Sequence, residues 1–181
     1  NVHRHLENLR SFGVPVVISI NRFRDDTPEE LGEIEAACRG LGATAIVTDY
    51  RESGGAGGLA LAEAVCAACE TPAAFRFLYD LDRGLRDKIE TIATRIYGAG
   101  SVEYSAGARA ELQRIEDLGY RALPICMAKT PASLSDNPKA TGCPEGFELN
   151  VSSAKVSAGA GFVVVYTGAI MTMPGLPRQP A

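Results

Sequence analysis

The sequence predicts an α/β fold built from layers of parallel sheet. Short apolar runs alternate with helical patterns through the first 70 residues, two amphipathic helical stripes fill the middle, and β-branched runs close the chain. A hydrophobic content of 46% with 22% charged residues is that of an ordinary globular protein. We therefore expect a folded protein with a substantial core.

The first elements are a helix followed by a strand. Leu6, Leu9 and Phe12 form an apolar stripe that ends at Gly13. The continuous apolar run 14–20 follows, and a run of this kind is typical of a strand buried on both faces.

The clearest helix start is the segment 27–30. Thr27 supplies an N-cap, Pro28 suits the first helical position and Glu30 completes a capping box. This helix is predicted to run to Gly40, and a strand (43–48) and a helix (59–70) follow. Strands that alternate with helices pair in parallel, so we expect a parallel sheet here.

The rest of the chain is predicted to contain two packing helices and three strands. The helices are predicted to cover 85–96 and 108–118. One strand is predicted at 121–128 and two within 147–172. A C-terminal tail follows that contains Pro174, Pro177 and Pro180. The polar segment 129–145 is too long for a simple connection, and such loops are often functional.

Charge and hydropathy exclude some partners. The formal net charge is −4 and no run of Lys or Arg exceeds a pair, which speaks against nucleic acid and polybasic membrane binding. No apolar stretch approaches the roughly 20 residues that span a bilayer. Five cysteines, an odd number, suit a reducing compartment. We expect a cytoplasmic protein, and a start at Asn1 inside a helical pattern indicates a cut within a longer one.

Several motifs have ordinary explanations. No G-x-x-x-x-G-K-[ST] motif exists to bind nucleotide phosphates. The glycine cluster 54–58 is either a flexible loop or a weak anion site. Cys66 and Cys69 lie inside a predicted helix, where we expect them to pack in the interior. His3 and His5 face different directions on a helix, so no metal site is predicted.

Two segments are candidate ligand sites. Residues 21–24 end the first strand, where α/β sheets bind ligands, and resemble the N-K-x-D loop of GTPases except for Arg24. Phe23, flanked by two arginines, is either a stacking platform for a flat ring or a core residue. The loop 129–138 is either a polar site or an ordinary turn network; its candidates are Lys129, Thr130, Ser133, Ser135, Asp136 and Asn137.

Five strings, in this order and spacing, resemble the formate–tetrahydrofolate ligases: 12–23, 123–130, 133–138, 157–162 and 171–177. The resemblance covers essentially the whole chain. It implies a C-terminal fragment, without the P-loop, of a P-loop NTPase-like enzyme. In that family ATP phosphorylates formate, and the N10 amine of tetrahydrofolate attacks the resulting formyl phosphate.

The resemblance also implies ligands and partners. They are the substrates formate, ATP and tetrahydrofolate, Mg²⁺ and a monovalent cation, a homotetramer, and the missing N-terminal part that binds the phosphates. Within this chain it implies a folate-side α/β lobe (1–120) and a C-terminal segment (121–181) that completes the nucleotide-binding core through the loop 129–138.

The implied folate-binding residues are Asn21, Phe23, Tyr50 and Arg51. Phe23 matches a family aromatic residue that packs on the pterin ring, whereas Arg51 stands where members usually have tryptophan. Either the Arg51 guanidinium or the Tyr50 ring would have to replace that tryptophan. Two other functions compete with this one: a non-catalytic subunit that needs a separate N-terminal chain, and a GTPase-type switch, against which the broken N-K-x-D and the missing P-loop both count.

Overall fold

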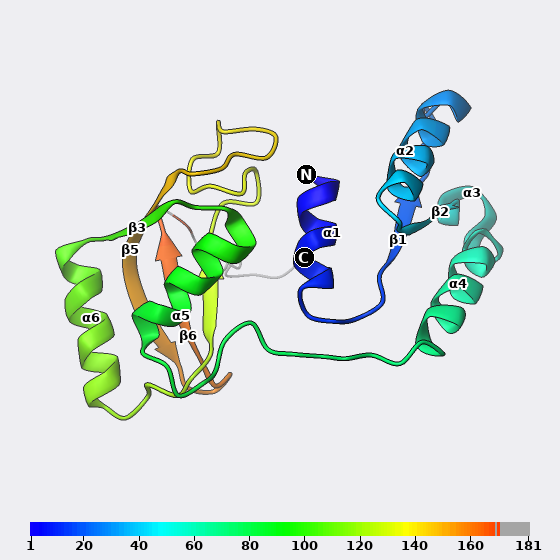
Figure 1. The fold of residues 1–181 in the computed structure, drawn as a ribbon. Coiled ribbons are helices and arrows are strands. Elements are labelled where there is room, and N and C mark those ends of the chain that lie inside the picture. Colours follow the sequence, from blue (N-terminus) through cyan, green and yellow to red (C-terminus); the bar gives the residue numbers. More distant parts are fainter. Residues whose placement is uncertain (169, 171–181) are drawn as a thin grey trace, which may run out of the picture. The chain divides into compact units, whose positions relative to one another are not determined.

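The computed structural model describes residues 1–168 and residue 170, and the chain divides after Phe77 into two compact units (Figure 1). The predicted boundary near residue 120 lies inside the second unit, because the helices before it and the strands after it share one core. The predicted proline-rich tail and the segment 171–177 lie outside the described residues.

The first unit follows the predicted order of helices and strands. Its elements are α1 (Val2–Arg10), β1 (Val17–Asn21), α2 (Pro28–Gly40), β2 (Thr44–Thr48), α3 (Tyr50–Ser53), the 3-10 helix η1 (Gly54–Gly58) and α4 (Leu59–Cys69). Only α3 and η1 were not predicted.

The capping box of α2 is present as predicted. The Thr27 hydroxyl accepts a hydrogen bond from the Glu30 backbone N–H at 3.2 Å, and the Thr27 backbone N–H donates to the Glu30 carboxylate at 3.0 Å. These bonds favour the ionised carboxylate and lower the pKa of Glu30. Two otherwise unpaired N–H groups at the helix start are thereby satisfied.

Strands β1 and β2 pair in parallel, in register from Val17 opposite Thr44 to Asn21 opposite Thr48, as predicted. The expectation that β1 is buried on both faces is wrong for this unit: only Ile20 in the strand is buried. The physical reason is that the sheet has just two strands among the described residues, so one edge of β1 has no strand beside it.

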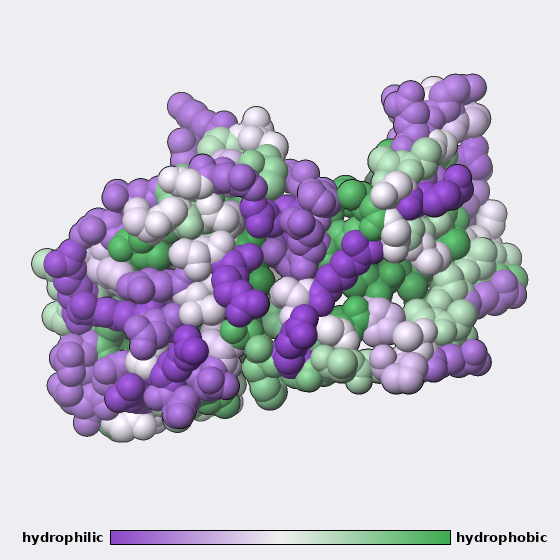
Figure 2. Space-filling model, viewed as in Figure 1, coloured by the Kyte–Doolittle hydropathy of each residue, from purple (hydrophilic) through white to green (hydrophobic). Residues whose placement is uncertain are grey.

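Helix α4 is apolar in sequence yet buries none of its residues. Leu59 is 63% exposed and Val65 is 44% exposed, and Figure 2 shows hydrophobic surface over the region of α4. Cys66 and Cys69 are both exposed free thiols, so the prediction that they pack in the interior is wrong.

The second unit is a four-stranded mixed sheet with helices on one side. Its elements are α5 (Leu85–Ile92), the π-helix η2 (Ala93–Tyr97), β3 (Ser101–Tyr104), α6 (Ala106–Asp117), β4 (Ile125–Ala128), β5 (Glu148–Ser157) and β6 (Phe162–Thr167). The strand order is β3-β5-β6-β4. The two outer strands pair in parallel with their neighbours, whereas β5 and β6 are antiparallel. The purely parallel arrangement that we expected therefore holds only in the first unit.

The core of this unit lies between the sheet and the helix pair α5 and α6, which pack on the same side of it (Figure 1). Inward residues of the two helices meet alternate residues of the strands; the buried set is Leu85, Ile89, Tyr104, Ala108, Leu112, Ile115, Val151, Ala154, Val163 and Val165. Gly98 and Gly119, with φ of 81° and 85°, follow η2 and α6 as the predicted stops.

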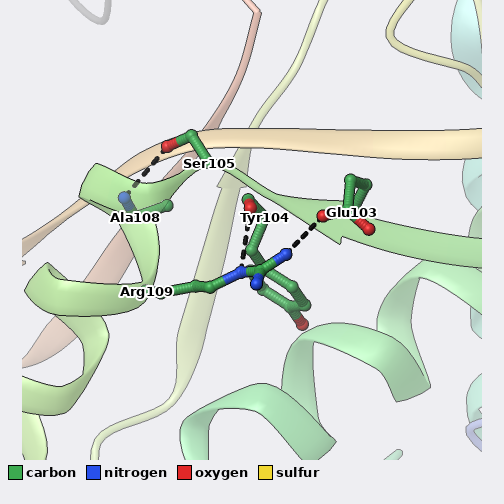
Figure 3. A network of polar contacts seen from close by, with 5 residues as sticks. All are labelled: Glu103, Tyr104, Ser105, Ala108 and Arg109. Carbon is green, nitrogen blue, oxygen red and sulfur yellow. Dashed lines mark hydrogen bonds and ion pairs between the residues drawn. The ribbon is translucent and has the colours of Figure 1, made fainter.

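The short strand β3, which was not predicted, leads directly into α6. The Ser105 hydroxyl accepts a hydrogen bond from the Ala108 backbone N–H at 3.0 Å and caps the helix (Figure 3). The Arg109 guanidinium donates to the Tyr104 carbonyl at 3.0 Å and forms an ion pair with Glu103. These contacts fix the turn from strand to helix.

Lys88 on α5 is a fully buried lysine, which is uncommon because burying an ammonium is costly. Its Nζ donates to the carbonyls of Arg121 at 2.6 Å and Leu123 at 3.0 Å. Burial lowers the pKa of Lys88, and the nearby Glu116 carboxylate opposes that shift. The lysine therefore ties α5 to the segment that enters β4.

Candidate functional site

A small cleft opens where β1 and β2 end, and we call it the strand-end cleft. Its lining residues come from the loop after β1 and from the loop and helix after β2: Arg22, Phe23, Arg24, Asp49, Arg51 and Glu52. Because the two strands are parallel, both loops lie at the carboxyl edge of the sheet, where α/β proteins place their ligands. The structure thus brings Phe23 and Arg51 to one place.

Phe23 is exposed at the surface and is not a core residue. Its side chain is 61% exposed. The backbone N–H of Phe23 donates to the Asp26 carboxylate at 2.7 Å, which holds the turn after β1 in shape. A large aromatic ring displayed on a fixed turn is available for stacking on a flat ligand.

Of the two candidates to face Phe23, Arg51 lines the cleft and Tyr50 does not. The Tyr50 ring packs over Gly58, where an added Cβ would lie 2.4 Å from Tyr50 Cε1. A glycine at this position is therefore needed to seat the ring. Arg51 is left as the candidate that shares the strand-end cleft with Phe23.

The glycine cluster 54–58 has a packing role. A Cβ at Gly57 would lie 2.1 Å from the Asp49 carbonyl oxygen, and the Asp49 N–H donates to the Gly57 carbonyl at 3.2 Å. Asp49 in turn caps α3 by accepting from the Glu52 N–H at 3.3 Å. Close backbone approach at Gly57 thus sets the position of the helix that carries Arg51.

The strand-end cleft has an excess of positive charge. Three guanidinium groups face two carboxylates, those of Asp49 and Glu52. No hydrogen bond or ion pair joins these guanidinium groups to any residue that the structure describes. Unpaired arginines beside an exposed aromatic ring suit a planar ligand with anionic groups.

Asn21 lies apart from Phe23. Its Oδ1 accepts from the Thr48 hydroxyl at 3.1 Å and from the Ser19 hydroxyl at 3.4 Å, which ties the ends of β1 and β2 together. Asn21 lines a different groove, beneath α2. Sequence reasoning placed it with Phe23 because the two are close in the chain, and it missed Asp49 and Glu52, whose only signal was proximity to Arg51.

In the loop 129–141, Lys129 is bonded to the loop itself. Its Nζ donates to the carbonyls of Thr130 at 2.8 Å and Ser135 at 3.2 Å, and also to that of Ser133. The ammonium also lies 5.2 Å from the centre of the Tyr97 ring. Burial lowers the pKa of Lys129, and Asp136 opposes the shift. A phosphate would have to compete with these carbonyls for the ammonium.

The other polar side chains of this loop also bond within the unit. The Ser133 hydroxyl donates to the Ala140 carbonyl at 2.6 Å, and the Ser135 hydroxyl accepts from the Asn137 N–H at 3.1 Å. The Thr130 hydroxyl accepts from the Ala132 N–H at 3.2 Å.

Two further contacts complete the loop. The Asn137 side chain accepts from the Lys139 N–H at 3.0 Å. The Asp136 carboxylate accepts from the N–H and the amide of Asn150 at 3.2 and 3.1 Å, which pins the loop to β5. The structure brings all six predicted loop residues together, and their contacts are those of a turn network.

No three His, Cys, Asp or Glu side chains among the residues that the structure describes gather closely enough to hold a metal ion. None of the helices in that part of the chain has the length and apolar character needed to cross a membrane.

Helices packed on parallel and mixed sheets define the chain as an α/β protein. The family model described as formate–tetrahydrofolate ligase matches residues 1–181. The formate–tetrahydrofolate ligase of Maricaulis maris (strain MCS10) is 51% identical over 182 aligned positions, which cover 100% of this chain and 33% of that relative. The chain belongs to the formate–tetrahydrofolate ligase family, and it spans about a third of the length of the curated relative it matches.

Proposed function

We propose that this chain is the C-terminal part of an ATP-dependent ligase that makes 10-formyltetrahydrofolate from formate and tetrahydrofolate, and that its strand-end cleft binds the folate. The observation that carries the folate site is the exposed Phe23 ring beside the unpaired Arg51 guanidinium. The pterin ring of the folate would stack on Phe23, with Arg51 as the opposite wall.

In the proposed reaction ATP transfers its γ-phosphoryl group to formate, giving ADP and formyl phosphate. The N10 amine of tetrahydrofolate then attacks the formyl carbon, phosphate leaves with the C–O bond electrons, and the amine loses its proton. The residues of this chain hold and orient the folate so that its amine meets the acyl carbon.

The phosphate-binding groups are assigned to the part of the ligase outside this chain, together with Mg²⁺ and a monovalent cation. The loop 129–141 is proposed to form one wall of the nucleotide pocket through its shape, because its side chains already bond to one another. The complete enzyme is further proposed to be a cytoplasmic homotetramer that includes the N-terminal part of the same polypeptide.

The test is steady-state kinetics of the complete ligase carrying Phe23→Ala. Loss of a stacking partner worth on the order of 1 to 3 kcal/mol should raise the KM for tetrahydrofolate about 5- to 150-fold and leave the KM for ATP unchanged. Tyr120→Ala, which removes a 39% exposed ring from the second unit, is the matched control. An unchanged KM for tetrahydrofolate in Phe23→Ala would contradict the folate site.

A further inference from the structure

The sequence of β1 is that of an interior strand, yet in this structure β1 lies at a sheet edge. Residues 14–20 are almost continuously apolar, the pattern of a strand covered on both faces in a parallel sheet. In the structure only Ile20 of β1 is buried, and Val17 and Ile18 are half-buried.

The direction of the backbone hydrogen bonds alternates along β1. This alternation shows which N–H and C=O groups face the strand edge that is not paired with β2. The Arg22 N–H donates to the Thr48 carbonyl, so position 22 points toward β2. Successive residues of a strand alternate in direction. The backbone N–H and C=O groups of Val17, Ser19 and Asn21 therefore point to the edge that has no strand among the described residues.

A groove of about 550 Å³ lies beside this strand and beneath α2. It is lined by four apolar side chains, by Asn21 and by three carboxylates; the apolar residues are Ile20, Leu31, Ile34 and Ala37, and the acidic ones are Asp26, Glu30 and Glu33. Ile34 is 43% exposed in the middle of the helix, on the side that opens to the groove. Apolar side chains together with charged ones are the composition of an interface that has a buried core and a solvated border.

We propose that an extended segment from the part of the ligase outside this chain adds a strand to the free edge of β1 and lays its apolar side chains in the groove beneath α2. About two thirds of the matched relative's length lies outside this chain, which is ample for such a segment. Strand addition satisfies the edge N–H and C=O groups, and the alternating side chains of the added strand fill the groove. This inference rests on family membership and is independent of the folate site.

The test is amide hydrogen exchange in the complete ligase, resolved to single residues. The amides of Val17, Ser19 and Asn21 should exchange at rates within about tenfold of those of Ile18, Ile20 and Arg22, because both edges of β1 are then paired. Exchange of the first set at least about 100-fold faster than the second would show an open edge and overturn the proposal.

A variant with a substitution in the groove tests whether the segment that protects the edge amides of β1 from exchange also fills the groove. Ile34→Asp in the complete ligase places a charge among the apolar side chains that line the groove. It should speed exchange at Val17, Ser19 and Asn21. Leu118→Asp, at a 61% exposed residue of the second unit, is the matched control and should leave those rates unchanged. Equal protection in Ile34→Asp and the unsubstituted ligase would overturn the role of the groove, and the comparison within the unsubstituted ligase stands even if the variant fails to fold.

Exchange at two protein concentrations separates a strand of the same polypeptide from a second copy of the chain. Protection that persists when the ligase is diluted until it dissociates supports the proposal. Protection that disappears with dissociation would assign the edge to another subunit and overturn it.

Discussion

Single residues show which features of the candidate site follow from the sequence and which depend on the folded chain. Phe23 was found because it follows a strand end, but whether its ring was buried depended on neighbours distant in the chain, and the structure places it at 61% exposure. Lys129 was identified by its charge. Its three carbonyl partners arise from the folded path of the loop, which no pattern of residue types specifies.

Arg51 leads to a prediction about folate affinity. A guanidinium stacks on a flat ring less extensively than an indole does, so Arg51→Trp should lower the dissociation constant for tetrahydrofolate about tenfold, within the range for one stacked ring. Arg51→Ala should raise it. Calorimetric titration of the complete ligase measures both, and equal affinity in all three proteins would remove Arg51 from the site.

Helices and parallel strands with strong local signals were predicted, and elements defined by distant partners were not. The capping box at Thr27 and the glycine stops at Gly98 and Gly119 are local chemistry, and each lies where the sequence placed it. Strand β3 has four residues and pairs with β5, whose partner residues begin at Glu148. No signal within those four residues marks them as a strand.

The glycine helix η1 permits a matched test of close packing. Gly57→Ala would place a Cβ 2.1 Å from the Asp49 carbonyl oxygen, whereas a Cβ at Gly55 meets nothing within 4 Å. Gly57→Ala should therefore destabilise the protein by about 1 to 3 kcal/mol and raise the KM for tetrahydrofolate by displacing Arg51. Gly55→Ala should do neither. Thermal unfolding and steady-state kinetics measure the two effects, and equal behaviour of the variants would contradict this role for Gly57.

The buried lysine Lys88, which ties α5 to the segment that enters β4, should make the stability of the protein depend on pH. The folded state holds Lys88 at a lowered pKa, while the unfolded chain has the ordinary value of about 10.4. Below the folded pKa both states are protonated, and folding bears the full cost of burying the charge. As the pH rises through the folded pKa toward about 10.4, the folded state loses its proton first and that cost shrinks, so stability from this group rises.

The midpoint of thermal unfolding, measured from neutral to alkaline pH, should therefore rise for the unsubstituted chain relative to Lys88→Met. Lys139→Met removes an exposed lysine and is the control, which should track the unsubstituted chain at every pH. A constant difference between the Lys88→Met and unsubstituted midpoints would contradict the lowered pKa.

At the scale of the whole molecule, the two units differ in how many of their apolar residues are buried. The core of the second unit consists of two clusters of buried apolar residues, and both are formed only by residues of that unit. The described apolar residues buried in the first unit are few: Leu6, Ile20, Cys38 and Ala43. The sequence pattern predicts α/β layers for both units, because it depends on which residues are apolar. It does not specify which other residues cover them.

The second unit should accordingly fold by itself. A fragment of residues 78–181 is expected to show a cooperative thermal transition by circular dichroism, because its hydrophobic core needs no residue from the first unit. The fragment 1–77 should show a broad, non-cooperative change. A cooperative transition in 1–77 and none in 78–181 would reverse this assignment.

The position of β5 between β3 and β6 has a consequence for synthesis. When β3 and α6 leave the ribosome, the strand that must pair with β3 has not yet been translated. Strands β1 and β2, by contrast, can pair as soon as residue 48 has emerged. The apolar faces of α5 and α6 therefore stay without a sheet until β5 and β6 are made, and apolar surface exposed during this interval favours aggregation of the nascent chain.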